Sequence, residues 1–241
     1  MAAARRVQFR TEGPHSCGIV QGGAKDHIQP IFNRCRKDQI MTKPKIALII
    51  GSTRATRFAD LPAQWMLAQA RARTDMEVEL LDLRDYHLPM FNEMASNAWM
   101  PSQDANAVKW QKKLAEFDGY IFVVAEYNRS ITGALKNALD QAYVEWAKKP
   151  MAAIAYGATG GTRAVEHLRM IAVELQMVPV RNAVHIGGGD FFGVHPGMGG
   201  SGNIADIEAN LLPAAKATLD DVVWWAKATM AAKAPKVVEA A

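Results

Sequence analysis

The chain has 241 residues, of which 49% are apolar and 22% are charged, a composition ordinary for a globular domain. Its formal net charge of +4 lies entirely in residues 1–40, which hold seven Lys and Arg against three Asp and Glu, whereas residues 41–241 hold 21 of each. The composition therefore offers no basic footprint for nucleic acid, and no apolar run is long enough to cross a membrane.

Residues 1–40 show neither helical nor alternating periodicity and are rich in Arg, Gln and Gly, so we expect a disordered N-terminal extension. Met41 stands just before the first predicted strand, and we hypothesise that translation can begin there. A transit peptide fits this segment less well because it contains Glu12, Asp26 and Asp38.

Both cysteines, Cys17 and Cys35, lie in this first segment, so the core has neither a disulfide framework nor a thiolate metal site. No apolar signal-peptide region follows Arg5 and Arg6. The six histidines lack the spacing of metal ligands, and we expect no metal. A reducing cytoplasm is the expected location.

From residue 41 to residue 231, apolar runs alternate with longer amphipathic stretches. The predicted strands are 45–50, 76–81, 119–124, 151–156 and 179–185, and the predicted helices are 58–73, 103–116, 131–147, 162–176 and 203–231. Five such β-α repeats predict one α/β domain, a three-layer sandwich with a five-stranded parallel sheet and helices on both faces. Residues 232–241 are expected to fray.

Ligands of such sheets bind beyond the carboxyl ends of the strands, so the loops after the first, third and fourth strands are the candidate site. The first of these loops, Gly51-Ser52-Thr53-Arg54-Ala55-Thr56-Arg57, leads from a buried strand into a helix. Glycine, hydroxyls, arginines and a helix N-terminus together predict a phosphate site. The sequence has neither a P-loop nor, at this turn, a dinucleotide fingerprint.

The loop after the third strand reads Glu126-Tyr127-Asn128-Arg129-Ser130 and precedes a predicted helix. Its aromatic, amide and carboxylate side chains suit a flat heterocycle, but a capped turn with Ser130 as the N-cap explains them equally well. The loop after the fourth strand has glycines at 157, 160 and 161. These glycines allow close approach of a ligand, although glycine is also common in turns.

Three motifs occur in order: Gly-Ser-Thr-Arg from residue 51, Glu-Tyr-Asn-Arg-Ser-Ile-Thr-Gly-Ala-Leu-Lys-Asn-Ala-Leu-Asp from residue 126, and Tyr-Gly-Ala-Thr-Gly-Gly-Thr-Arg-Ala from residue 156. Together they resemble the NAD(P)H-dependent FMN reductase family, which includes chromate and quinone reductases. The resemblance covers roughly residues 44–186 and implies a flavodoxin-like fold with bound FMN. It also implies NADH or NADPH as the co-substrate and a homodimer or homotetramer.

The resemblance assigns a role to each of the three loops. For the first loop it implies contacts with the FMN phosphate from Ser52, Arg54, Thr56 and Arg57, with Phe58 just beyond. For the second loop it implies contacts with the flavin ring from Glu126, Tyr127, Asn128 and Ser130. For the third loop it implies contacts at the other edge of the ring from Gly157, Gly160, Gly161 and Arg163. The family usually has proline where Ala125 stands and often where Thr132 stands, which implies a less rigid loop here. No catalytic side chain is required, because FMN carries the electrons.

Four other features have more than one interpretation. The segment 86–93 borders either the substrate entrance or a subunit contact, or it is only a loop pinned by proline. The glycine-rich stretch 187–202 is either a lid tipped by Phe191 and Phe192 or a loose connector. Tyr143 and Trp146 belong to the core or to a subunit interface, which Trp146 favours. His167 is expected to be a solvated or capping residue.

We expect an FMN-dependent NAD(P)H oxidoreductase acting on a small-molecule acceptor such as a quinone, chromate, an azo compound or free flavin. A flavodoxin-type electron carrier without NAD(P)H turnover is the first alternative, although the zero net charge of residues 41–241 argues against a carrier that docks through an acidic surface. A phosphate-ester enzyme using Arg54 and Arg57 is the second alternative, and it lacks a nearby nucleophile.

Overall fold

The computed structural model describes residues 42–234, so the predictions for residues 1–40 and for most of the C-terminal tail concern residues outside this range. The strands are β1 (Lys45–Ile50), β2 (Glu77–Asp82), β3 (Gly119–Ala125), β4 (Pro150–Tyr156), β5 (Val178–Pro179) and β6 (Val184–Ile186). The α-helices are α1 (Asp60–Arg71), α2 (Ala105–Ala115), α3 (Gly133–Asp140), α4 (Thr162–Glu174), α5 (Gly188–Val194) and α6 (Glu208–Lys233). Short 3-10 helices cover Leu83–Asp85, Pro196–Met198 and Ile204–Ile207.

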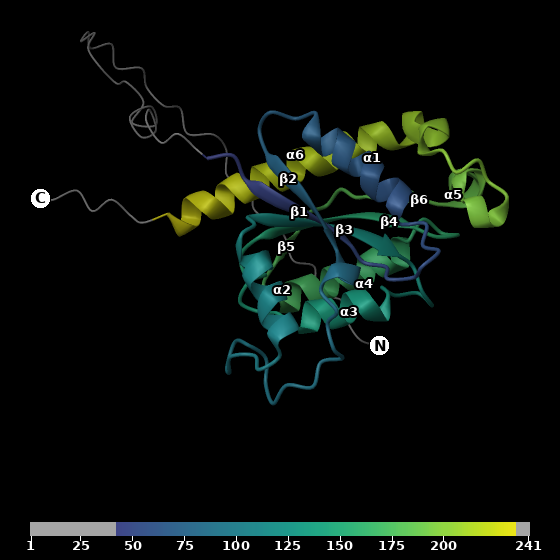
Figure 1. Cartoon of the computed structure of the whole chain (residues 1–241). Helices are drawn as coiled ribbons and strands as arrows, with labels where there is room; N and C mark the ends of the chain where they lie inside the picture. Colours follow the sequence, from purple (N-terminus) through teal and green to yellow (C-terminus); the bar gives the residue numbers. More distant parts are fainter. Residues whose placement is uncertain (1–41, 235–241) are drawn as a thin grey trace, which may run out of the picture. The chain divides into compact units, whose positions relative to one another are not determined.

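The strands form one parallel sheet in the order β2-β1-β3-β4-β5, and β6 also pairs with β4. Helices α1 and α6 cover one face of the sheet, and α2, α3 and α4 cover the other (Figure 1). This strand order is the flavodoxin-like one. The predicted three-layer α/β fold is therefore confirmed.

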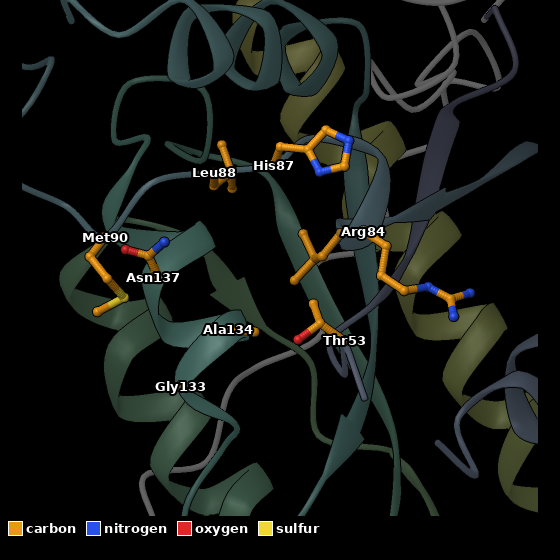
Figure 2. A pocket seen from close by; sticks show the side chains of 9 residues that line it. Thr53, Arg84, His87, Leu88, Met90, Gly133, Ala134 and Asn137 are labelled. Atoms are coloured by element: carbon orange, nitrogen blue, oxygen red, sulfur yellow. The ribbon is translucent and has the colours of Figure 1, made fainter. Parts of the chain in front are cut away.

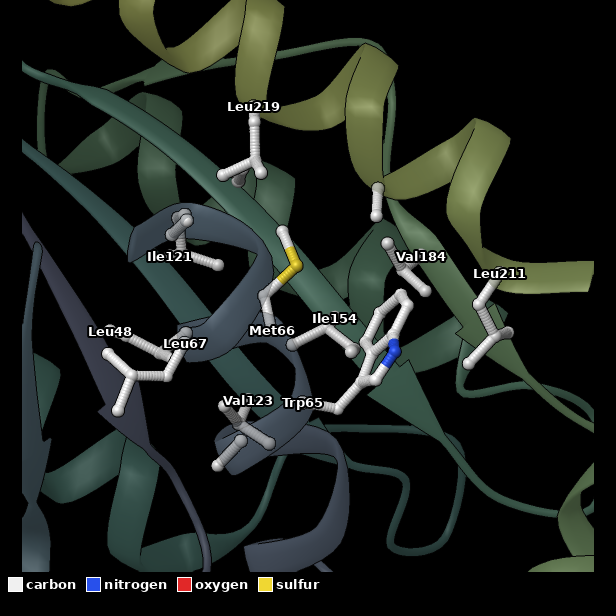
Figure 3. Close-up of a cluster of buried hydrophobic side chains, with 14 of the residues drawn as sticks. Leu48, Trp65, Met66, Leu67, Ile121, Val123, Ile154, Val184, Leu211 and Leu219 are labelled. Carbon is white, nitrogen blue, oxygen red and sulfur yellow. The ribbon is translucent and has the colours of Figure 1, made fainter. Parts of the chain in front are cut away.

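The central strands are apolar throughout because both faces of the sheet are covered. Every residue of β3 and β4 is buried, and only the first residue of β1 is not. On the α1 and α6 side, Leu48, Ile121 and Ile154 of the strands pack against Met66 of α1 and Leu219 of α6 (Figure 3). This two-sided burial explains why continuous apolar runs predicted these strands well.

The fifth predicted strand, 179–185, is two short strands rather than one. β5 pairs with the start of β4 and β6 with its end. Two residues interrupt the predicted strand. Pro179 has no N–H to donate to the sheet, and the side-chain amide of Asn182 donates to Asp221 of α6 at 2.8 Å. The sheet consequently has six strands, with a break at its edge.

The helix predicted over 131–147 begins at Gly133 and ends at Asp140. The chain then turns inward, which buries Trp146 completely and lets its indole N–H donate to the Leu139 carbonyl at 3.1 Å. The interface position favoured for Trp146 is therefore wrong. Apolar residues keep a helical spacing through this turn, which is why the sequence predicted a longer helix.

The glycine-rich stretch 187–202 is neither loose nor an open lid. Residues 188–194 form α5, in which Phe191 is buried and Phe192 is half exposed. The Phe191 ring packs against Phe58, with ring centroids 5.4 Å apart. A short helix therefore fixes this stretch behind the first loop.

Helix α6 continues to Lys233, two residues beyond the predicted end of the domain. Within residues 42–234, none of the helices combines the length and hydrophobicity needed to span a bilayer.

Candidate functional site

The loops that follow β1, β3 and β4 lie at the carboxyl edge of the sheet. β1 and β3 are neighbours in the sheet. After β1 the chain forms β2 on one side of this pair, and after β3 it forms β4 on the other side. The carboxyl ends of strands at such a switch point form the usual ligand crevice of open α/β sheets. The site is therefore where strand order predicts it.

The first loop presents a row of backbone donors. Within the described residues, no protein group accepts from the N–H groups of Thr53, Arg54, Ala55 or Thr56, and these four residues are exposed. Ser52 just before them is buried. Gly51 is required here, because a Cβ at this position would lie 2.9 Å from the Val123 carbonyl oxygen. The loop can thus surround an anion with N–H groups and hydroxyls.

The two arginines of this loop have different surroundings. The Arg54 side chain is exposed, and a hydrogen bond with Tyr127 of the second loop raises its pKa. The Arg57 side chain is only 1% exposed. Arg57 donates to the Ser52 carbonyl at 2.8 Å and forms ion pairs with Asp60 and Asp82.

Charge pairing keeps the Arg57 network ionised despite its burial. Burial by itself would lower the pKa of Arg57, but the hydrogen bonds from Arg57 to Asp82 and Asp60 outweigh it and raise the pKa. The same contacts, together with Arg84, outweigh burial and hold the pKa of Asp82 below its ordinary value. The donors of Arg57 face these protein acceptors, which leaves Arg54 as the cation of the loop that can meet a ligand.

Phe58, which lies just beyond the first loop, belongs to an aromatic cluster behind it. Its ring stacks on His195 with centroids 5.0 Å apart and meets Tyr156 edge-on at 5.0 Å. Phe191 completes this cluster. Phe58 is itself buried, so it supports the loop from behind.

The second loop is a tight turn closed by two backbone hydrogen bonds between Tyr127 and Ser130, at 2.9 and 3.0 Å. Asn128 and Arg129 between them have φ values of 48° and 73°, the left-handed pair of a type I′ turn. Asparagine adopts this conformation readily, whereas arginine is strained in it. The turn leaves Tyr127 37% exposed beside Arg54.

Ser130 does not act as the predicted N-cap. Thr132 takes that role, since its hydroxyl accepts from the Leu135 N–H at 3.1 Å and also donates to the Gly51 carbonyl. Thr132 therefore joins the first and second loops where the family often has proline. The Ser130 hydroxyl instead lies 2.5 Å from Nδ1 of His167 on α4, a partner that the sequence did not indicate.

Glu126 points toward α4 and not into open space. Its carboxylate accepts from the backbone N–H groups of Arg163 at 3.2 Å and Ala164 at 3.4 Å, and from the Thr159 hydroxyl at 3.2 Å. The Arg163 guanidinium pairs with the same carboxylate. Glu126 and Arg163 thus fasten the second loop to the third.

The glycines of the third loop serve its own packing. Gly160 and Gly161 have φ values of 73° and 66°, and a Cβ on Gly161 would lie 2.7 Å from the Ala155 Cβ. A Cβ on Gly187 would collide with the backbone of Gly160. Gly157 is less crowded, because a Cβ added there would meet the Glu126 Cβ at 3.3 Å as its nearest neighbour.

Tyr156, the last residue of β4, is a further candidate site residue, which the sequence alone does not reveal. Burial raises the pKa of its phenol, Tyr127 raises it further, and a hydrogen bond with Ser52 opposes both. Its hydroxyl therefore belongs to the same group as Ser52, Arg54 and Tyr127. A tyrosine at the end of a strand is not distinguishable from a core residue in a single sequence.

A cavity of about 580 Å³ opens beside the first loop, on the α3 side of the sheet (Figure 2). Its lining residues are Thr53, Leu83, Arg84, His87, Leu88, Met90, Gly133, Ala134 and Asn137. The segment 86–93 supplies one wall through His87, Leu88 and Met90. Within residues 42–234, His, Cys, Asp and Glu form no group of three or more placed to hold a metal ion.

Two curated flavin reductases are similar in sequence to this chain. The NAD(P)H-dependent FMN reductase ntnL of Nectria is 39% identical over 126 residues, which are 50% of this chain and 63% of that protein. The NAD(P)H-dependent FMN reductase C4B3.06c of Schizosaccharomyces pombe is 34% identical over 56% of this chain and 68% of its own length. The match to the Nectria protein thus spans less than two thirds of its length.

Among solved structures, the flavoenzyme FerB, an NAD(P)H:(acceptor) oxidoreductase from Paracoccus denitrificans, shares the fold. Its TM-score is 0.57 at 21% identity, over 77% of this chain and 98% of that chain. The family model described as NADPH-dependent FMN reductase matches residues 44–190, and this range contains all three loops. The chain belongs to the NADPH-dependent FMN reductase family.

Proposed function

We propose that this protein is an FMN-dependent oxidoreductase that passes electrons from NAD(P)H to a small-molecule acceptor. The observation that carries the proposal is that three loops meet at one edge of the sheet: the first presents four exposed backbone N–H groups, the second exposes Tyr127, and bonds from Thr132 and to Glu126 join the three. This group combines a donor-rich loop with exposed aromatic surface, as a phosphorylated flat ring requires.

The donors of the first loop fit the terminal phosphate of FMN. Four consecutive N–H groups, from Thr53 to Thr56, have no acceptor within the described residues, and the Arg54 guanidinium stands beside them. Arg57 acts from behind, where it holds the Ser52 carbonyl. We assign direct phosphate contact to Ser52, Arg54 and Thr56, and a supporting role to Arg57 and Phe58.

The second and third loops would hold the ring. Tyr127 and Asn128 lie on the exposed turn, whereas Glu126, Ser130, Gly160 and Gly161 fix the loops that surround it. FMN supplies the hydride and electron chemistry when it is bound, and the protein orients and tunes it. Gly157 is the third-loop position that we assign to close approach of the ring.

The acceptor class follows from the family, and we propose quinones, chromate, azo compounds or free flavin. The 580 Å³ cavity lies next to Thr53 of the first loop and is bordered by Leu88 and Met90. These apolar side chains suit a flat aromatic acceptor or a nicotinamide nucleotide. We propose that ligands approach the flavin from this side.

A homo-oligomer and a cytoplasmic location complete the proposal. The segment from Met90 to Met100 exposes large apolar side chains, with Met94 at 88% and Trp99 at 85% exposed. Exposed clusters of this kind commonly mark contacts between proteins. A second copy of the chain is the partner that we propose, and sedimentation velocity would measure it. The cytoplasmic location rests on the absence of cysteine from residues 42–234.

Reconstitution tests the function. Purified protein supplied with FMN is expected to become yellow, to bleach with NADPH or NADH under anaerobic conditions, and to recolour when a quinone is added. A protein that binds FMN but does not bleach with either nucleotide would be an electron carrier instead. A colourless protein that takes up no FMN would rule out the cofactor.

A further inference from the structure

The Glu126–Arg163 ion pair joins the two loops that face the proposed ring position. The Glu126 side chain is 5% exposed and that of Arg163 is 37% exposed, so one charge is buried and the other reaches the surface. Glu126 follows the last residue of β3, and Arg163 lies in the first turn of α4. A ring held between these loops would lie beside both charges.

Glu126 also occupies the position where α4 would attract an anion. The first N–H groups of a helix carry a partial positive charge, and Glu126 accepts from two of them, those of Arg163 and Ala164. Burial opposes ionisation of Glu126, but the contacts with Arg163, Ala164 and Thr159 outweigh it and lower the pKa of the carboxyl. The site thus contains a fixed negative charge and a fixed positive one.

We propose that Glu126 and Arg163 are a pair of positioning residues that set the reduction potential of bound FMN through their opposite charges. The inference rests on the proposed function. Reduction adds negative charge to the flavin, so a nearby carboxylate disfavours it and a nearby guanidinium favours it. Partial burial weakens solvent screening of both effects.

The test is the midpoint potential of FMN bound to Glu126→Gln, to Arg163→Gln and to the double variant. Glutamine keeps an oxygen that can accept from the α4 N–H groups, so the first substitution removes mainly charge. We expect Glu126→Gln to raise the potential, Arg163→Gln to lower it, and the double variant to return close to the wild-type value. A purely structural role would not produce opposite shifts that cancel.

Asp220→Asn is the matched control, because Asp220 also pairs with an arginine, Arg73, which follows the end of α1 remote from the three loops. It should leave the potential unchanged. A second readout needs no flavin: in the apoprotein, the Arg163 and Ala164 amides should stay protected from hydrogen exchange in Glu126→Gln, whose amide oxygen still accepts from them, and should lose protection in Glu126→Ala.

Shifts of equal sign in the two single variants, or no shift in either, would overturn the proposal. If Arg163→Gln holds no FMN, Glu126→Gln alone must raise the potential. Failure of the wild-type protein to bind FMN would instead contradict the proposed function, so the two failures are distinguishable.

Discussion

Arg54 and Arg57 stand three positions apart in one loop, yet the fold gives them different surroundings. Arg54 is exposed beside Tyr127, whereas Arg57 is enclosed by Asp60, Asp82 and the Ser52 carbonyl. Sequence alone could not separate them, because Asp82 is 25 residues away from Arg57 and reaches it only through the pairing of β1 with β2.

Single substitutions should therefore have different effects at the two arginines. Arg54→Ala is expected to weaken FMN binding roughly ten- to hundredfold without changing stability, because it removes a charge-assisted contact. Arg57→Ala should lower the free energy of unfolding by about 2 kcal/mol, because it removes a buried guanidinium that bonds the Ser52 carbonyl and leaves Arg84 as the remaining cation beside Asp82. Flavin titration and urea denaturation would measure the two effects.

Arg71→Ala is the control for both measurements, since Arg71 is an exposed arginine at the end of α1. It should change neither quantity. Equal losses of flavin affinity in Arg54→Ala and Arg57→Ala, with stability intact, would show that Arg57 contacts the phosphate directly.

Among the helices and strands, the sequence correctly predicted those whose position depends on a local pattern of apolar residues. The runs in β1, β3 and β4 are apolar because both faces are covered, and this signal needs no knowledge of partners. The end of α3 and the break between β5 and β6 depend on long-range contacts instead. Burial of Trp146 and the bond from Asn182 to Asp221 decide them.

The start of α4 provides a test at this scale. Gly161→Ala should lower the free energy of unfolding by at least about 2 kcal/mol, because φ is 66° and the added Cβ would meet the Ala155 Cβ at 2.7 Å. Gly189→Ala in α5 is the control, since no atom would crowd its Cβ within 4 Å. It should be neutral or slightly stabilising. Similar denaturation midpoints for both variants would refute this role of Gly161.

For the whole molecule, a buried charge lies near the edge of the sheet opposite the three loops. The Lys149 ammonium donates to the Tyr120 hydroxyl at 3.0 Å and to the Leu114 carbonyl at 3.3 Å, and its side chain forms no ion pair within residues 42–234. Burial, with a smaller effect from Lys233, lowers its pKa to about 8. Nothing in the sequence around Lys149 distinguishes it from its exposed neighbour Lys148.

Because the folded protein binds this proton less tightly than the unfolded chain does, Lys149 reduces stability most below pH 8. The penalty then fades as the pH rises toward the ordinary lysine value of 10.5. Lys149→Met is expected to be more stable than wild type at pH 7, by up to about 3 kcal/mol, and to lose this advantage between pH 8 and pH 10. Denaturation at several pH values would measure the trend, with exposed Lys112→Met as the control. A difference independent of pH would contradict it.

The contacts around the site form a closed circuit. Thr132 links the first loop to the second, Glu126 links the second to the third, Gly160 of the third touches Gly187, and Phe191 returns from α5 to Phe58 of the first. If one of these four contacts is removed, the other three still join all the segments, whereas removal of two contacts detaches a segment from the rest. We therefore expect that loss of one contact leaves the site in place. Loss of two contacts should lower the free energy of unfolding by more than the sum of the two separate losses.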